Sequence, residues 1–179
     1  LMPALLDMSK HAGISTGQGD KAINVVALSH CGQYFYCGDE AGSIIRESAY
    51  YVSNDAGKQK AVSILEEAHN GNAVTAICCA QGDLLFTGDN AGIMKKWVIP
   101  GLKKLELKSV FKTAIYKIVT TDDGKFVFVL ERTGKLRQHS ARGLELVQDL
   151  NSLHKKVISD MIALPDSRNL FTFDFEGGV

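Results

Sequence analysis

The adjacent carboxylates Asp122 and Asp123 are the pair of residues in this sequence that most resembles an acid–base couple. Two carboxyl groups in one site can serve as general acid and general base when their environments differ. Gly124 follows them directly, however, and Asp-Gly is favoured in tight turns for backbone reasons alone. We therefore expect a turn at this position and no catalysis.

His69 and His154 are the next candidates, because imidazole can act as a base or bind a metal near neutral pH. Each lies just before an apolar stretch, and we expect structural hydrogen bonds from both rings. The sequence has no Gly-rich phosphate loop and no Gly-x-Ser-x-Gly nucleophile turn. It therefore indicates neither an enzyme nor a cofactor, and we expect no small-molecule substrate.

The four cysteines, Cys31, Cys37, Cys78 and Cys79, are too few and too irregularly spaced for a disulfide scaffold. Cys78 and Cys79 are adjacent on a predicted strand, so their side chains should point to opposite faces. No Cys-x-x-Cys pair or histidine cluster suggests zinc. We expect buried, reduced thiols and no metal site.

The composition is that of an ordinary folded domain. The 179 residues include 45% hydrophobic and 22% charged residues, and 20 basic side chains balance 20 acidic ones. Zero net charge gives no general attraction to nucleic acid or to an anionic membrane. The N-terminus lacks the basic region of a signal peptide, and no apolar run could span a bilayer. We expect an intracellular protein, cytoplasmic or nuclear, without a membrane partner.

An internal repeat is the main feature of the sequence. Tyr36–Gly42 and Phe86–Gly92 match as aromatic-x-Gly-Asp-x-Ala-Gly, and weaker copies end at Gly134 and Gly177. The spacings between the four turn glycines are 50, 42 and 43 residues, close to the 40 to 45 of a four-stranded propeller blade. The longer first interval contains a polar insertion between Ser48 and Glu67.

Each copy has the same order of elements: an apolar strand, a turn, a short aromatic strand, a glycine turn and a third strand. This pattern predicts an all-β protein of four-stranded antiparallel sheets. We divide the chain into a lead-in at 1–19, which could supply a strand of a preceding or closing blade, and repeats at 20–68, 69–112, 113–153 and 154–179.

The chain resembles the WD40 family of β-propellers, most clearly in the second repeat. His69-Asn70-Gly71 resembles the Gly-His segment of the family, and Trp97, five residues after Gly92, occupies the Trp-Asp position. The resemblance implies structural roles for His69, Thr87, Trp97 and the turn glycines Gly42, Gly92, Gly134 and Gly177.

The repeats also depart from the family pattern. The Trp position holds Glu47 in the first repeat and His139 in the third, and the structural Asp would fall at Ala41, Ala91 and Thr133. We therefore expect the His–Ser/Thr–Asp–Trp hydrogen-bond network to be incomplete in every blade. Because WD40 rings usually have seven blades, about four blades predict part of a larger propeller. Self-association and closure by the N-terminal strand are the alternatives.

The resemblance implies a docking face built from the turns after the second strands and from the loops that enter each blade. Those turns carry mostly acidic residues, which predict a negative rim suited to a basic peptide, with Phe175 as an apolar anchor. The alternative is that these residues merely solubilise the turns. The rim consists of Asp39, Glu40, Asp89, Asn90, Glu131, Arg132, Asp174, Phe175 and Glu176.

The predicted function is a non-catalytic scaffold for protein–protein interaction within a multiprotein complex. The second hypothesis is an RNA- or ribosome-associated propeller that uses a basic region. That region comprises Lys95, Lys96, Lys103, Lys104, Lys108 and Lys112. No series of aromatic residues accompanies these lysines, which disfavours RNA binding.

Overall fold

The computed structural model describes residues 21–49, 63–99, 103–151, 153–164 and 169–178, and these form strands and turns without any helix. The predicted lead-in at 1–19 and residues 50–62 of the polar insertion lie outside these ranges. Glycine turns that interrupt apolar segments too short for helices explain the all-β outcome.

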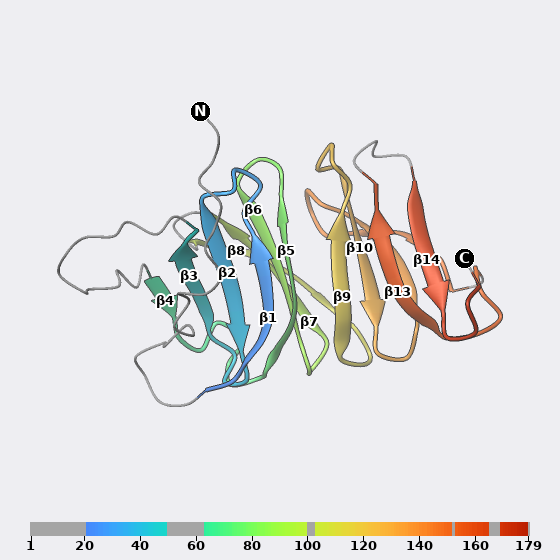
Figure 1. Ribbon diagram of the computed structural model, residues 1–179, viewed down its shortest axis with the longest axis horizontal. Helices are drawn as coiled ribbons and strands as arrows, with labels where there is room; N and C mark the ends of the chain where they lie inside the picture. Colours follow the sequence, from blue (N-terminus) through green and yellow to red (C-terminus); the bar gives the residue numbers. More distant parts are fainter. Residues whose placement is uncertain (1–20, 50–62, 100–102, 152, 165–168, 179) are drawn as a thin grey trace, which may run out of the picture.

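The strands form four successive sheets, which we call blades one to four (Figure 1). Blade one contains β1 (Ile23–Leu28), β2 (Tyr34–Asp39), β3 (Ile44–Ser48) and β4 (Ser63–Leu65). Blade two contains β5 (Val74–Ala80), β6 (Leu84–Asp89), β7 (Ile93–Val98) and β8 (Lys103–Val110). Blade three contains β9 (Ile115–Thr120), β10 (Phe126–Glu131), β11 (Leu136–Ser140) and β12 (Leu146–Asp149). Blade four contains β13 (Ile158–Ala163) and β14 (Leu170–Asp174).

Every pairing is antiparallel between strands that follow one another in the chain. Three sheets have four strands, and the fourth has two within the part of the chain that the structure describes. The predicted fold class, all-β with four-stranded propeller blades, is confirmed. A register shift recurs where each first strand begins to pair with the second, as at Val74/Ala76 opposite β6. Such bulges add to the local twist of the strands.

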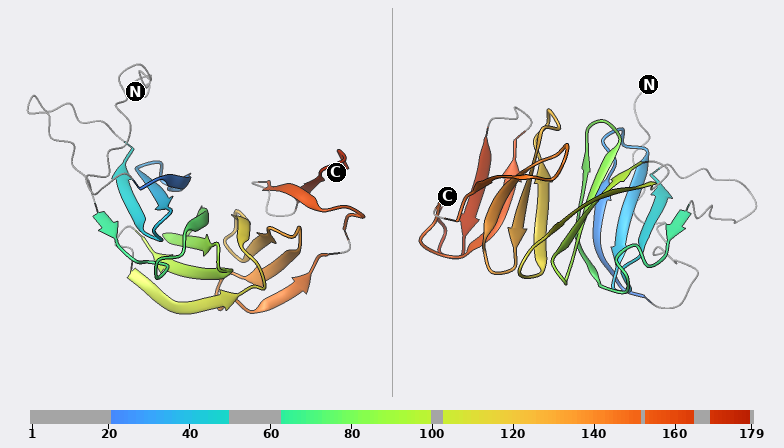
Figure 2. Two further views of the ribbon diagram at one scale, coloured as in Figure 1. Left: turned by 90° about the horizontal axis from the view of Figure 1, so that it is seen from below. Right: turned by 180° about the vertical axis from the view of Figure 1, so that it is seen from behind.

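The blades follow one another along an arc (Figure 2). The first strands of neighbouring blades are in contact, β1 with β5, β5 with β9 and β9 with β13. The second strand of a blade also approaches the first strand of the next, β2 to β5 and β6 to β9. A Cβ on Gly38 of β2 would lie 2.5 Å from Val74 Cγ1, and one on Gly88 of β6 would lie 2.6 Å from Ile115 Cγ2. The blades can therefore pack this closely because these two strands carry no side chain there.

The hydrophobic core lies between blades. Tyr36 of β2 packs in one cluster with Ile77 and Trp97 of blade two, and Phe86 of β6 packs in another with Ile118 of blade three. Phe128 of β10 does the same towards blade four. The aromatic residue of each second strand thus anchors the next blade, as the alternation of side chains along a strand requires.

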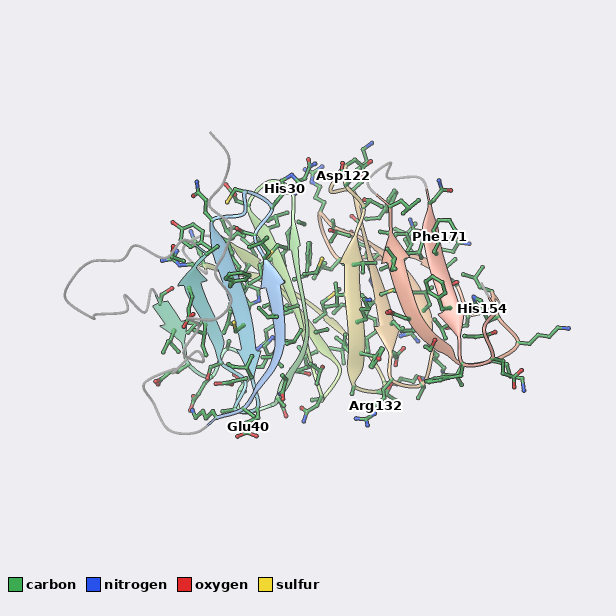
Figure 3. All side chains as sticks on the ribbon, in the orientation of Figure 1. His30, Glu40, Asp122, Arg132, His154 and Phe171 are labelled. Atoms are coloured by element: carbon green, nitrogen blue, oxygen red, sulfur yellow. The ribbon has the colours of Figure 1, made fainter. Side chains whose placement is uncertain are left out.

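Phe171 of β14 occupies the same strand position as these three aromatics and is 43% exposed (Figure 3). Its cross-strand neighbour Ile162 is also exposed. On the opposite side of the arc, Val26 and Leu28 of β1 are exposed as well. Both outer faces therefore present residues of the kind that neighbouring blades bury elsewhere.

Candidate functional site

The turns after β2, β6 and β14 are held by a carboxylate at the end of each strand. Oδ1 of Asp39 accepts hydrogen bonds from the backbone N–H of Ala41 and Ser43 at 3.0 and 2.7 Å. Asp89 and Asp174 repeat this pattern with the amides two and four residues on. These hydrogen bonds, chiefly the one from the Gly178 N–H, hold the pKa of Asp174 below its usual range.

Glu131 takes a different role in the corresponding turn of blade three. Its Oε2 accepts hydrogen bonds from the N–H and hydroxyl of Thr113 at 3.2 and 3.0 Å. Its Oε1 lies 2.6 Å from Nη1 of Arg137. A longer carboxylate thus ties the turn to the preceding loop and to β11.

The expectation of an exposed acidic rim is therefore wrong for Asp39, Asp89 and Glu131, which are buried. Asp174 is only partly accessible. Each carboxylate faces inward because it replaces hydrogen bonds that the turn amides would otherwise make with water. The remaining predicted residues are exposed: Glu40, Asn90, Arg132, Phe175 and Glu176.

Blade two contains a complete buried network of four side chains. His69 Nδ1 lies 2.7 Å from Asp89 Oδ2, and His69 Nε2 lies 2.7 Å from Thr87 Oγ1. The indole Nε1–H of Trp97 donates to the same Thr87 oxygen at 2.8 Å. The expectation that this network is incomplete in every blade is wrong, because the aspartate ends strand β6 at position 89 and does not sit in the turn at Ala91.

Blade four repeats part of this network. His154 Nε2 lies 2.7 Å from Thr172 Oγ1, and His154 Nδ1 lies 3.3 Å from Asp174 Oδ2. Both histidines thus fix the loop that enters their blade. In blades one and three the Trp position holds Glu47 and His139, which pair with β2 and β10 in the same register as Trp97 with β6.

The loops before β5, β9 and β13 lie against the turns of the preceding blades. A Cβ on Gly42 would meet the carbonyl of Asn72, one on Gly92 would meet the carbonyl of Phe111, and one on Gly134 would meet Val157. A Cβ on Gly177 would meet no atom within 4 Å. Turns and loops therefore form one surface, which we call the loop face. It comprises residues 40–43, 66–73, 90–92, 111–114, 132–135, 153–157 and 175–177.

The loop face lies at one end of the blades, and the turns after the first strands lie at the other. Figure 3 shows Glu40 and Arg132 at the first end and His30 and Asp122 at the second. The exposed acidic residues Glu40, Glu66 and Glu67 belong to the loop-face segments of blade one. The exposed basic residues lie further along the arc: Lys112, Arg132, Lys135, Lys155 and Lys156.

The proposed basic region is not a continuous exposed surface. Lys95 and Lys96 are both 6% exposed, and their amines donate to backbone carbonyls, that of Lys95 to Ala68 at 2.6 Å and that of Lys96 to Ala141 at 2.7 Å. Burial lowers the pKa of Lys96. Strand alternation sends these two lysines into opposite blade interfaces, where their long stems contribute to packing. Lys103 and Lys112 are exposed.

The end opposite the loop face offers little chemistry. An open depression of about 330 Å³ lies there between β5, β9 and β13, with Cys78, Thr120 and Asp122 among its lining residues. Asp123 accepts hydrogen bonds from Thr121 and Lys125, which lower its pKa to about 2, as expected for a turn carboxylate. The four cysteines are free. Cys37 is buried as expected, whereas Cys78 and Cys79 are partly buried and Cys31 is exposed.

Within the described ranges, no group of three or more His, Cys, Asp or Glu side chains is arranged to hold a metal ion. The same ranges contain no helix long and apolar enough to cross a membrane.

No family model and no curated protein matches the sequence. A solved chain from the "Crystal Structure of Mitotic Checkpoint Complex" matches the structure with a TM-score of 0.71 and 13% sequence identity. The match covers 86% of this chain and 44% of that chain. The four sheets are β-propeller blades. Because 1005 solved chains match, the likeness identifies an architecture and no particular activity.

The four-stranded antiparallel sheets fit the blades of a β-propeller. The chain spans less than half the length of the matching chain in the checkpoint-complex structure.

Proposed function

We propose that this chain is a non-catalytic scaffold of the WD40 family, which binds other proteins through its loop face within a multiprotein complex. The matching chain comes from the structure of a mitotic checkpoint complex, which is in keeping with protein partners. The His69–Thr87–Asp89–Trp97 network supports membership of the family, since the resemblance implies a His–Ser/Thr–Asp–Trp network with His69, Thr87 and Trp97 among its members. An intracellular location, cytoplasmic or nuclear, belongs to the same proposal.

The proposal rests on one observation: in the turns of the loop face, an exposed side chain follows an inward-facing carboxylate. In blades one, two and three a buried carboxylate is followed by an exposed residue: Glu40, Asn90 and Arg132, respectively. In blade four the partly accessible Asp174 is followed by Phe175. The buried group fixes the backbone of the turn, so little backbone freedom is lost when the exposed side chain binds a partner.

The exposed outer faces support a larger ring. Phe171 and Ile162 on blade four, and Val26 and Leu28 on blade one, present apolar side chains where the other blades meet their neighbours. We propose that further blades cover these faces, because exposed apolar surface of this kind favours association.

The RNA hypothesis is weaker, since two of its six lysines are buried between blades. No series of aromatic residues accompanies the remaining lysines in the sequence, as base stacking would require.

The test is affinity capture from a native lysate with two matched triple variants. The loop-face variant carries Glu40→Arg, Asn90→Arg and Arg132→Glu. The control carries the same kinds of change at the opposite end: Asp122→Arg, Gln81→Arg and Lys125→Glu, all at exposed positions. We expect the loop-face variant to lose a defined set of proteins that wild type and the control retain, with or without nuclease.

If the loop-face variant retains the same proteins as wild type, the loop face is not the docking surface. If nuclease removes the captured proteins, nucleic acid mediates the association and the scaffold proposal fails. Circular dichroism of each variant establishes that it is folded.

A further inference from the structure

The loop before β13 is clamped between two turns of the loop face. On one side Gly134 lies so close that a Cβ there would be 2.5 Å from Val157 Cγ1. On the other side His154 Nε2 lies 2.7 Å from the Thr172 hydroxyl, and Lys156 Nζ lies 2.8 Å from Glu176 Oε1. The turns of blades three and four and this loop are therefore in contact with one another.

The charges of this surface are unbalanced. The turn carboxylate of blade three, Glu131, is buried and already bound to Thr113 and Arg137. Glu176 is exposed, but it is paired with Lys156. Three further cations are exposed without an ion pair among the described residues: Arg132, Lys135 and Lys155.

Large apolar side chains stand among these cations. Phe175 is 77% exposed, Leu153 54% and Val157 47%. We call these three residues together with Arg132, Lys135, Lys155 and Lys156 the basic–apolar patch. The loop-face segments around blade one differ: their exposed charges are Glu40, Glu66 and Glu67, and they expose no large hydrophobic residue.

We infer that the basic–apolar patch binds an acidic protein segment that carries apolar side chains. This inference rests on the proposed function, and it replaces the basic peptide expected from the sequence with a partner of opposite charge. Carboxylates of the partner would pair with Arg132 and Lys155, while an apolar side chain covers Phe175 or Val157. Charge complementarity supplies specificity and fast association, and burial of the apolar side chains supplies most of the affinity.

The side chains of the patch favour protein over nucleic acid. Single-stranded nucleic acid is bound by several aromatic side chains along a basic groove, and this patch has one exposed aromatic residue, Phe175. Leu153 and Val157 match aliphatic or aromatic side chains of a peptide and have no counterpart in a nucleotide backbone.

The experiment selects partners from a displayed library of random short peptides on immobilised wild-type chain. Counter-selection uses the double variant Arg132→Glu and Lys155→Glu. The matched control is Lys125→Glu with Arg142→Glu, two exposed cations at the opposite end, where the backbone of residue 141 bonds that of residue 125. Enriched peptides are then synthesised, and their Kd is measured by fluorescence anisotropy at low and high salt.

We expect the enriched peptides to be acidic and to contain Leu or Phe. The double variant should bind them about tenfold more weakly or worse, a loss of roughly 1.4 kcal/mol. Phe175→Ser should also weaken binding, and the control variant should bind like wild type. Higher salt should raise the Kd, because the cations are exposed and screened.

Enrichment of neutral or basic peptides overturns the inference, and so does equal weakening by the control variant. Basic peptides whose binding depends on Glu40 and Glu67 would leave the loop-face function standing while removing the acidic partner. Binding that no loop-face substitution alters would remove both. Oligouridine that binds through Arg132 and Lys155 more tightly than any selected peptide would assign the patch to RNA.

Discussion

The imidazole Nδ1 of His69 lies 2.7 Å from Oδ2 of Asp89, with both side chains buried in blade two. One proton arrangement satisfies the whole network: His69 Nδ1–H donates to Asp89, the Thr87 hydroxyl donates to His69 Nε2, and the Trp97 indole donates to the Thr87 oxygen. The Thr87 hydroxyl is therefore the group that joins the loop before β5 to strand β7.

Replacing Thr87 with Val keeps the shape of the side chain and removes two hydrogen bonds at once. His69 Nε2 and Trp97 Nε1 would each be left buried without a partner. We expect the free energy of unfolding to fall by about 3 kcal/mol, measured by urea denaturation. Thr133→Val, in an exposed turn of blade three, should change stability little. Equal losses for both variants would contradict a role for the network in stability.

His139 makes stability depend on pH. Burial, together with the charge of nearby Arg137, lowers the pKa of His139 below 6.5. A hydrogen bond to the Leu144 carbonyl acts in the opposite direction but does not outweigh burial. The His139 imidazole is therefore protonated more readily in the unfolded chain than in the folded one. The free energy of unfolding should consequently fall as the pH drops below about 6.5. His139→Phe removes this titration and keeps a ring beside Phe111.

Denaturation of both proteins between about pH 7.5 and 5.5 measures this difference. The free energy of unfolding should fall more steeply for wild type than for His139→Phe. Parallel curves would show that His139 does not resist protonation in the folded state.

Alanine substitutions at Gly92 and Gly82 distinguish the energetic cost of steric contact from that of backbone strain. Both have positive φ, +82° and +73°. A Cβ on Gly92 would lie 2.7 Å from the carbonyl oxygens of Phe111 and Thr113, whereas one on Gly82 would meet nothing within 4 Å. Gly82→Ala should cost about 1 kcal/mol of left-handed strain, and Gly92→Ala about 3 kcal/mol or more.

Thermal and urea unfolding of the two alanine variants give the comparison. Similar destabilisation in both would mean that the loop before β9 moves away from the turn at little cost.

Substitution of Lys96 tests whether this residue has a structural role or contacts nucleic acid. Its amine donates to the carbonyls of Ala141 and Arg142 at 2.7 and 3.1 Å, and it is buried. Lys96→Met should destabilise the protein by about 2 kcal/mol, since two carbonyls lose a donor. Lys103→Met, at an exposed position, should leave stability unchanged.

Neither substitution should alter retention on immobilised RNA at moderate salt. Loss of RNA retention by Lys96→Met with unchanged stability would restore the basic-region hypothesis.

The fold could be predicted from the sequence because local features define the repeat. Turn glycines such as Gly42 and Gly92 have positive φ, and short apolar segments between them can form only strands. Trp97 was placed by its distance from Gly92, and the strand register agrees. These features depend on residues that are neighbours in the chain.

The roles of the acidic residues were harder to predict. Asp39 accepts hydrogen bonds from the backbone amides two and four residues further along the chain. This short spacing is a local signal from which the role of Asp39 in the turn could have been predicted. The side-chain alternation of β7 sends Lys95 and Lys96 in opposite directions, but it does not predict that each amine reaches a carbonyl of another segment. Residues separated by 27 and 45 positions share no sequence pattern that reveals such a contact.

By itself the sequence determined the strands, the turns and their repetition, since backbone preferences and hydrophobic alternation act over a few residues. The tertiary structure decided which charges remain at the surface. Asp89 and Glu131 are buried because partners from other segments, His69 and Thr113, replace their contacts with water. Arg132 and Lys155 stay exposed, and neither forms an ion pair with another described residue.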